Sequence, residues 1–120
     1  MSDFECIDQN DVEDVAVVKF KDEKVVDPSR IEAMGTELLS LASGDEPRKL
    51  LINFENVRFF SSAAINKLIV LEKRVRAQGG LIKLCNLRPE VGDLFNFTNL
   101  DNLFPIFDSQ DKAIEAFGNE

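Results

Sequence analysis

The stretch of residues 49–85 constrains the fold of this chain more than any other segment. It begins with an apolar run at residues 49–54 and ends with another at residues 81–85. Between these runs lie a short loop, a pattern with helical periodicity that ends near Gln78, and the glycine pair Gly79-Gly80. Two short apolar strands joined by a helical crossover are typical of a βαβ unit, in which the strands are parallel and the crossover is right-handed. The stretch therefore predicts a helix that covers one face of a parallel sheet.

The remaining segments predict an α/β fold around this unit, with residues 1–120 forming one domain. We expect a small mixed sheet of about five strands and four helices, with a parallel centre and a short antiparallel edge made by the first two strands. Apolar and β-branched runs predict strands at residues 3–7, 15–20, 50–54, 81–85 and 103–107, with residues 8–14 as a polar turn and Val25-Val26 as a short buried bridge. Capping residues, helical spacing and glycine stops predict helices from Asp27 to Gly44, from Ser61 to Gln78, from Pro89 to about Phe95 and from Asp108 to Gly118. The last strand belongs at a sheet edge, because Pro105 has no backbone donor.

The central helix has one apolar face, which we expect to pack on the sheet. That face is formed by Ala64, Ile65, Leu68, Leu71 and Val75. Ile69 and Val70 fit neither this face nor the polar one. They are interpreted either as a second buried flank or as part of an apolar contact surface.

The composition disfavours several classes of protein. The chain has no histidine, which removes the commonest general base and metal ligand, and its two cysteines lie in apolar runs as expected for buried reduced thiols. We therefore predict no catalytic site, no metal and no cofactor. The net charge of −8 argues against direct binding of nucleic acid or of an anionic membrane surface. No apolar run is long enough to span a bilayer and no secretory signal is visible, so we predict a cytoplasmic protein without membrane insertion.

Charge is distributed unevenly along the chain. The span from Ser61 to Pro89 holds six basic residues and a single acid, Glu72. One interpretation is an ordinary solvated helix face. The other is a basic docking edge for an acidic partner, formed by Lys67, Lys73, Arg74 and Arg76.

Two serine hydroxyls, those of Ser61 and Ser62, fall where the central helix begins. Serine is a good helix N-cap, so capping alone accounts for their presence. The same position suits phosphorylation, because a phosphate at a helix N-terminus meets free N–H groups and the positive end of the helix dipole. A facing partner would then encounter nearly two new negative charges.

The order and spacing of these motifs resemble the STAS domain, the family of bacterial anti-sigma factor antagonists. The resemblance rests on residues 50–54, on Val57-Arg-Phe-Phe-Ser-Ser-Ala-Ala-Ile-Asn-Lys-Leu68, on residues 79–86, and on the closing segment at residues 100–107. Asp27 stands where the family often has an aspartate before the first helix. When the sequences are aligned through Ile65 and Leu68, Ser62 occupies the family's first serine position and Ala63 its usual phosphoacceptor position.

The resemblance implies a regulatory binding module without catalysis, which captures an anti-sigma factor with serine kinase activity. It implies phosphorylation at Ser62, with Ser61 as the second choice, and a monomer or weak homodimer. The partner-binding residues implied are Asp27, Ser61, Ser62, Ala63, Lys67, Val70, Lys73 and Arg74. The alternative is a structural STAS subunit of a signalling scaffold or lipid-transport complex that is never phosphorylated.

Overall fold

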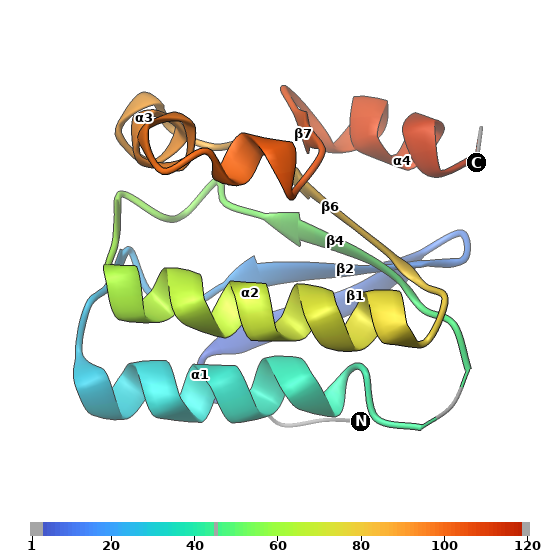
Figure 1. Cartoon of the computed structure of the whole chain (residues 1–120), viewed down its shortest axis with the longest axis horizontal. Helices are drawn as coiled ribbons and strands as arrows, with labels where there is room; N and C mark the ends of the chain where they lie inside the picture. The colour runs from blue at the N-terminus through green and yellow to red at the C-terminus, as the bar shows by residue number, and fades with distance from the viewer. Residues whose placement is uncertain (1–3, 45, 119–120) are drawn as a thin grey trace.

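The computed structural model describes residues 4–44 and 46–118, which form a mixed sheet with helices on both of its faces (Figure 1). The strands are β1 (Ile7–Val12), β2 (Val15–Phe20), β3 (Lys24–Val25), β4 (Lys49–Asn53), β5 (Phe59–Phe60), β6 (Leu81–Cys85) and β7 (Ile106–Phe107). The helices are α1 (Pro28–Ser40), α2 (Ser62–Ala77), α3 (Pro89–Phe97) and α4 (Gln110–Gly118), and a short 3-10 turn spans Leu100–Asn102.

The topology of the sheet confirms the predicted α/β class. Within the described residues, the main sheet has five strands in the order β1-β2-β4-β6-β7. β1 and β2 are antiparallel, and the other three neighbouring pairs are parallel. β7 lies at an edge, as the proline before it requires. The connections from β2 to β4 and from β4 to β6 carry α1 and α2, so these two helices lie side by side on one face (Figure 1).

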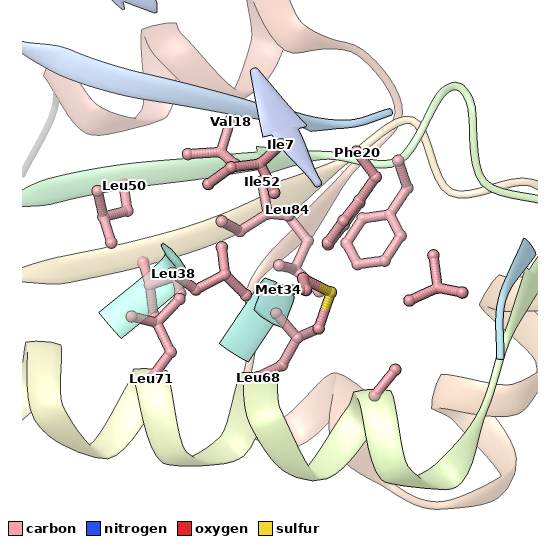
Figure 2. Close-up of a cluster of buried hydrophobic side chains, with 14 of the residues drawn as sticks. Ile7, Val18, Phe20, Met34, Leu38, Leu50, Ile52, Leu68, Leu71 and Leu84 are labelled. Carbon is pink, nitrogen blue, oxygen red and sulfur yellow. The ribbon is translucent and has the colours of Figure 1, made fainter. Parts of the chain in front are cut away.

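The main core fills the space between the sheet and this helix pair. Figure 2 shows Leu68 and Leu71 of α2 and Met34 and Leu38 of α1 directed toward the strands, where they meet residues such as Ile52. All five residues predicted for the apolar face of α2 are buried, which confirms the phase of that helix. A smaller cluster on the opposite face packs α4 against the sheet through Ala113 and Phe117.

The first strand lies later in the chain than the apolar pattern predicts. Residues 3–7 carry the apolar signal, but β1 is Ile7–Val12 and its turn contains only Glu13 and Asp14, with Glu13 at a φ of 58°. Asp3 lies outside the described residues. The physical reason is that β1 is an edge strand, on which polar residues meet water and weaken the apolar alternation.

Two very short strands form a second ladder that sequence reasoning did not predict. β3 pairs in parallel with β5, which places Lys24 opposite Phe59 and Val25 opposite Phe60. Val25 is buried, whereas Val26 is 48% exposed, so only the first valine forms the expected bridge. This ladder joins the segment before α1 to the segment before α2.

The two long helices end in different ways. α1 ends at Ser40, earlier than predicted, because the chain tightens there into turns in which the Ala42 N–H donates to the Leu39 carbonyl (3.0 Å). Gly44 follows with a φ of 99°. α2 ends at Ala77, and Gly79 adopts a φ of 77° as the predicted left-handed stop.

Candidate functional site

Ser61, and not Ser62, caps the N-terminus of α2. Its backbone is extended, and its Oγ accepts a hydrogen bond from the Ala64 N–H at 3.2 Å. Its own N–H donates to the carbonyl of Val25 at 3.1 Å, so the position is held from both sides. Ser62 is the first residue of the helix and is exposed, and its hydroxyl makes no hydrogen bond to any described residue. Capping therefore accounts for the Ser61 hydroxyl, whereas the Ser62 hydroxyl makes no stabilising hydrogen bond to the described residues.

The starts of α1 and α2 lie at the same end of the molecule, at the left in Figure 1. The β3–β5 ladder brings Asp27 to this end, where its carboxylate caps α1. It accepts from the Ser29 hydroxyl (2.6 Å) and from the Arg30 N–H (3.0 Å). These two bonds, the hydroxyl first, lower the pKa of Asp27 below its usual value. Asp27 thus supplies a fixed negative charge at neutral pH.

Two exposed apolar side chains lie at this ladder, Phe59 within β5 and Val26 directly after β3. Val26 is 48% exposed and Phe59 is 51% exposed, and the Lys24 ammonium lies 5.7 Å from the centre of the Phe59 ring. Sequence reasoning gave Phe59 no role and expected Val26 to be buried with Val25. Phe59 faces outward because its neighbour Phe60 is buried and side chains alternate along a strand. We define the α2 N-terminal surface as Val26, Asp27, Phe59, Ser62 and Ala63.

The outer face of α2 continues this surface along the helix. Its exposed positions are Ser62, Ala63, Asn66, Val70, Lys73, Arg74 and Ala77, which we call the α2 outer stripe. Ile69 packs on the core, as in the interpretation of this pair as a buried flank. Val70 is 43% exposed, as in the interpretation of the pair as part of an apolar contact surface. Lys73 lies about 17 Å from Ser62 along the axis at 1.5 Å per residue. A single partner surface is large enough to touch both.

The basic residues of the span from Ser61 to Pro89 occupy different environments. Lys67 is tied to α1, because its ammonium pairs with Glu32 at 2.6 Å and its methylene chain lies across Gly35. Lys83 is 4% exposed and lies over the Phe107 and Phe117 rings. In contrast, no carboxylate oxygen of the described residues lies within 4 Å of the charged nitrogens of Lys73 or Arg74. The predicted basic edge thus reduces to these two exposed cations, with Arg76 beside them.

The two thiols do not contribute to this surface. Cys6 and Cys85 are both buried and free. Burial is the main cause that raises the pKa of Cys85, to about 12, and the charge of Glu55 adds to it. Both cysteines are therefore protonated and unreactive at neutral pH. Within residues 4–44 and 46–118, no group of three or more potential metal ligands occurs, and no helix is long and apolar enough to cross a membrane.

Removing the cap and removing its neighbour should have different effects on stability. Ser61→Ala is expected to lower the free energy of unfolding by about 1 kcal/mol, the usual value of a serine N-cap. Ser62→Ala is the matched control and should change it by less than about 0.5 kcal/mol, because its hydroxyl is exposed. Urea denaturation of both variants measures the difference. Equal losses would show that Ser61 is not the cap.

The fold and the site define a small α/β module in which the outer face of α2 is exposed. The STAS domain family model matches residues 9–113, and the chain belongs to this family. BtrV of Bordetella bronchiseptica, which is named as an anti-sigma factor antagonist, is 27% identical over 93 residues, covering 78% of this chain and 79% of BtrV.

Solved structures show the same fold. An anti-sigma factor antagonist (STAS) domain protein from Planctomyces limnophilus superposes with a TM-score of 0.86 at 26% identity, over 93% of this chain and 97% of that one. The anti-sigma factor antagonist SpoIIAA in its unphosphorylated form gives a TM-score of 0.74 at 18% identity, over 95% of this chain and 97% of that one. The chain is therefore a STAS domain similar to anti-sigma factor antagonists.

Proposed function

We propose that this protein is a cytoplasmic, non-catalytic regulator that binds an anti-sigma factor with serine kinase activity, and that phosphorylation of Ser62 ends the binding. The observation that carries the proposal is the position of Ser62. It is an exposed hydroxyl in the first turn of α2, with no structural task and with a partner-sized exposed face beside it. The family membership and the likeness to BtrV support the class of partner.

The geometry favours Ser62 over Ser61 as the phosphoacceptor. The Ser61 hydroxyl is engaged in the cap, so its modification would cost the helix a hydrogen bond. At Ser62 a phosphate would lie beside the backbone N–H groups of Ser62 and Ala63, for which the described residues offer no acceptor. The fold itself is compatible with phosphate, since SpoIIAA has been solved in a phosphorylated form as well. Phosphorylation at Ser62 would thus leave the domain folded and change only its surface.

The proposed contact surface combines the α2 N-terminal surface with the α2 outer stripe. Phe59, Val26 and Val70 supply exposed apolar area near the switch, and Asp27 supplies a fixed charge. Lys73 and Arg74 supply two unpaired cations for an acidic region of the partner. Lys67 serves this surface indirectly, by fixing α2 against α1.

Binding through these cations should depend on salt. Affinity for the partner is expected to fall as ionic strength rises through the physiological range, because exposed charges are screened over about 8–10 Å. Replacing both Lys73 and Arg74 with glutamate should slow association more than it speeds dissociation. The control is Lys112→Glu with Lys19→Glu, which makes the same change of net charge on the other face of the sheet, at two cations paired with Asp108 and Glu55. Surface plasmon resonance measures both rates. Binding that does not depend on salt would mean that Lys73 and Arg74 belong to an ordinary solvated helix face and not to the interface.

A second candidate function is a STAS subunit that scaffolds a larger assembly and is never phosphorylated. Ala63 at the family's usual acceptor position favours it. The fold also occurs as 19% of the chain of Slc26a9, an anion transporter, at 15% identity with a TM-score of 0.76.

Affinity capture from the native cells distinguishes the two functions. Tagged parent protein and tagged Ser62→Asp would be purified in parallel and the bound proteins identified by mass spectrometry. The proposal predicts a serine kinase of the anti-sigma type that the parent retains and Ser62→Asp loses. Recovery of transport or scaffold subunits by both proteins would overturn it in favour of the second function.

A further inference from the structure

A small cavity lies on the flank of α2 that faces β6 and the segment before β7. Its volume is about 230 Å³, and its walls are Glu72 and Arg76 of α2, residues 80–83 of the β6 region, and Leu103 and Pro105. Sites for small molecules usually measure about 300–1,000 Å³, so this one suits one or two side chains better than a cofactor. It contains neither Ser62 nor any other residue of the α2 outer stripe.

The cavity presents a buried carboxylate that lacks a hydrogen-bond donor. Glu72 is 6% exposed, and no described residue donates a hydrogen bond to its Oε1. Among the described residues its only ionic contact is a single 3.4 Å approach by Arg76, whose side chain is 63% exposed. Buried polar atoms are usually satisfied, and at 3.4 Å the Arg76 guanidinium is too far from this carboxylate to make a strong hydrogen bond. The Glu72 Oε1 atom can therefore accept a hydrogen bond from an additional donor that enters the cavity.

Among the described residues, one wall of the cavity is an unpaired stretch of a strand edge, at Ile82, whose side chain is buried in the core. The Leu81 N–H donates to Arg48 on the β4 side, whereas the Leu84 N–H donates to Pro105 on the β7 side. Because backbone groups alternate along a strand, the N–H and C=O of Ile82 point to the β7 side as well. β7 pairs only with Leu84 and Cys85, so within the described residues no strand lies beside Ile82. Such an edge is a template for an added strand.

We propose that this cavity docks an extended segment of a partner protein, which pairs with the Ile82 backbone and inserts an arginine that donates to Glu72. The backbone of an extended segment complements both the N–H and the C=O of Ile82. An arginine suits the Glu72 carboxylate, because its guanidinium offers several donors in a planar fork that matches a carboxylate. This interaction goes beyond the proposed function, since it uses neither Ser62 nor the outer stripe.

A designed peptide tests the proposal with the full chain. The acetylated and amidated peptide Thr-Val-Arg-Val-Thr would be titrated into isotope-labelled protein, with the same peptide carrying glutamate in place of arginine as the comparison. We expect amide shifts centred on Ile82, Lys83 and Leu103. Binding should be about tenfold or more tighter for the arginine peptide, the scale of a charged hydrogen bond. Shifts centred elsewhere, or equal affinity for the two peptides, would overturn the proposal.

Two matched variants assign the effect to the carboxylate. Glu72→Gln keeps the side-chain size and should weaken the arginine peptide about tenfold. Glu115→Gln makes the same change of net charge on the exposed surface of α4 and should leave affinity unchanged. Equal behaviour of the two variants contradicts the site, and the comparison of peptides on the parent decides the question even if Glu72→Gln folds poorly. Ser62→Asp should bind the peptide like the parent, so this test can fail or succeed independently of the switch.

Discussion

Replacing Phe54 with alanine is expected to lower the free energy of unfolding by ~3–5 kcal/mol. Phe54 is fully buried, and its ring centre lies 5.1 Å from that of Phe20, 5.3 Å from Phe60 and 5.8 Å from Phe95. Alanine would leave a cavity among three aromatic rings and remove the contacts of Phe54 with each of them. Phe60 directly precedes the Ser61 cap, so the loss also weakens the support of the α2 N-terminus. Urea denaturation followed by circular dichroism measures the change.

Phe97 offers a matched control for this substitution. It is 88% exposed at the end of α3, so Phe97→Ala should change the free energy of unfolding by less than about 0.5 kcal/mol. A loss below about 1 kcal/mol for Phe54→Ala, or a similar loss for both variants, would mean that the aromatic cluster does not hold this end of the sheet.

Ser62→Asp is expected to weaken binding of the anti-sigma partner by ~1–3 kcal/mol while the protein remains folded. An acidic residue in the first turn interacts favourably with the helix dipole, so the free energy of unfolding should change by no more than ~1 kcal/mol. In the partner complex the same charge lies at the centre of the proposed interface. Isothermal titration calorimetry gives the affinity and thermal melting gives the stability.

Ser62→Asn separates charge from shape in this experiment. Asparagine has nearly the size of aspartate and no charge, so it should lose clearly less affinity than Ser62→Asp. If the Ser62→Asp variant binds the partner as tightly as the parent protein does, the loop is not at the interface. If asparagine and aspartate weaken binding equally, the effect is steric and the phosphate analogy fails.

The elements with strong local signals could be predicted from the sequence. The βαβ unit, the phase of α2 and the cap at Asp27 follow from periodicity, glycine stops and capping chemistry. The edge strand β1 was misplaced, because half of its side chains face water and carry no apolar signal. The β3–β5 ladder escaped prediction because two residues are too few to show any alternation.

The candidate site could be predicted in its location but not in its chemistry. The residue pattern placed two hydroxyls at the start of α2, and only the backbone geometry shows that Ser61 is engaged and Ser62 is free. The basic residues looked equivalent in sequence, whereas tertiary packing ties Lys67 to α1 and buries Lys83. The sequence carries no sign that Glu72 is buried, because the residues that enclose it are distant in sequence.

The most direct test of the proposed switch is the phosphorylation state of this loop in protein isolated from its native cells. Intact mass and fragmentation would be measured for the parent, for Ser62→Ala and for Ser61→Ala. We expect phosphate on Ser62 in the parent, persistence of that phosphate in Ser61→Ala, and none at this loop in Ser62→Ala. We also expect that the phosphorylated fraction no longer holds the anti-sigma partner. Phosphate that persists in Ser62→Ala, or a parent that cycles on and off its partner without ever carrying phosphate at this loop, would contradict the proposed switch.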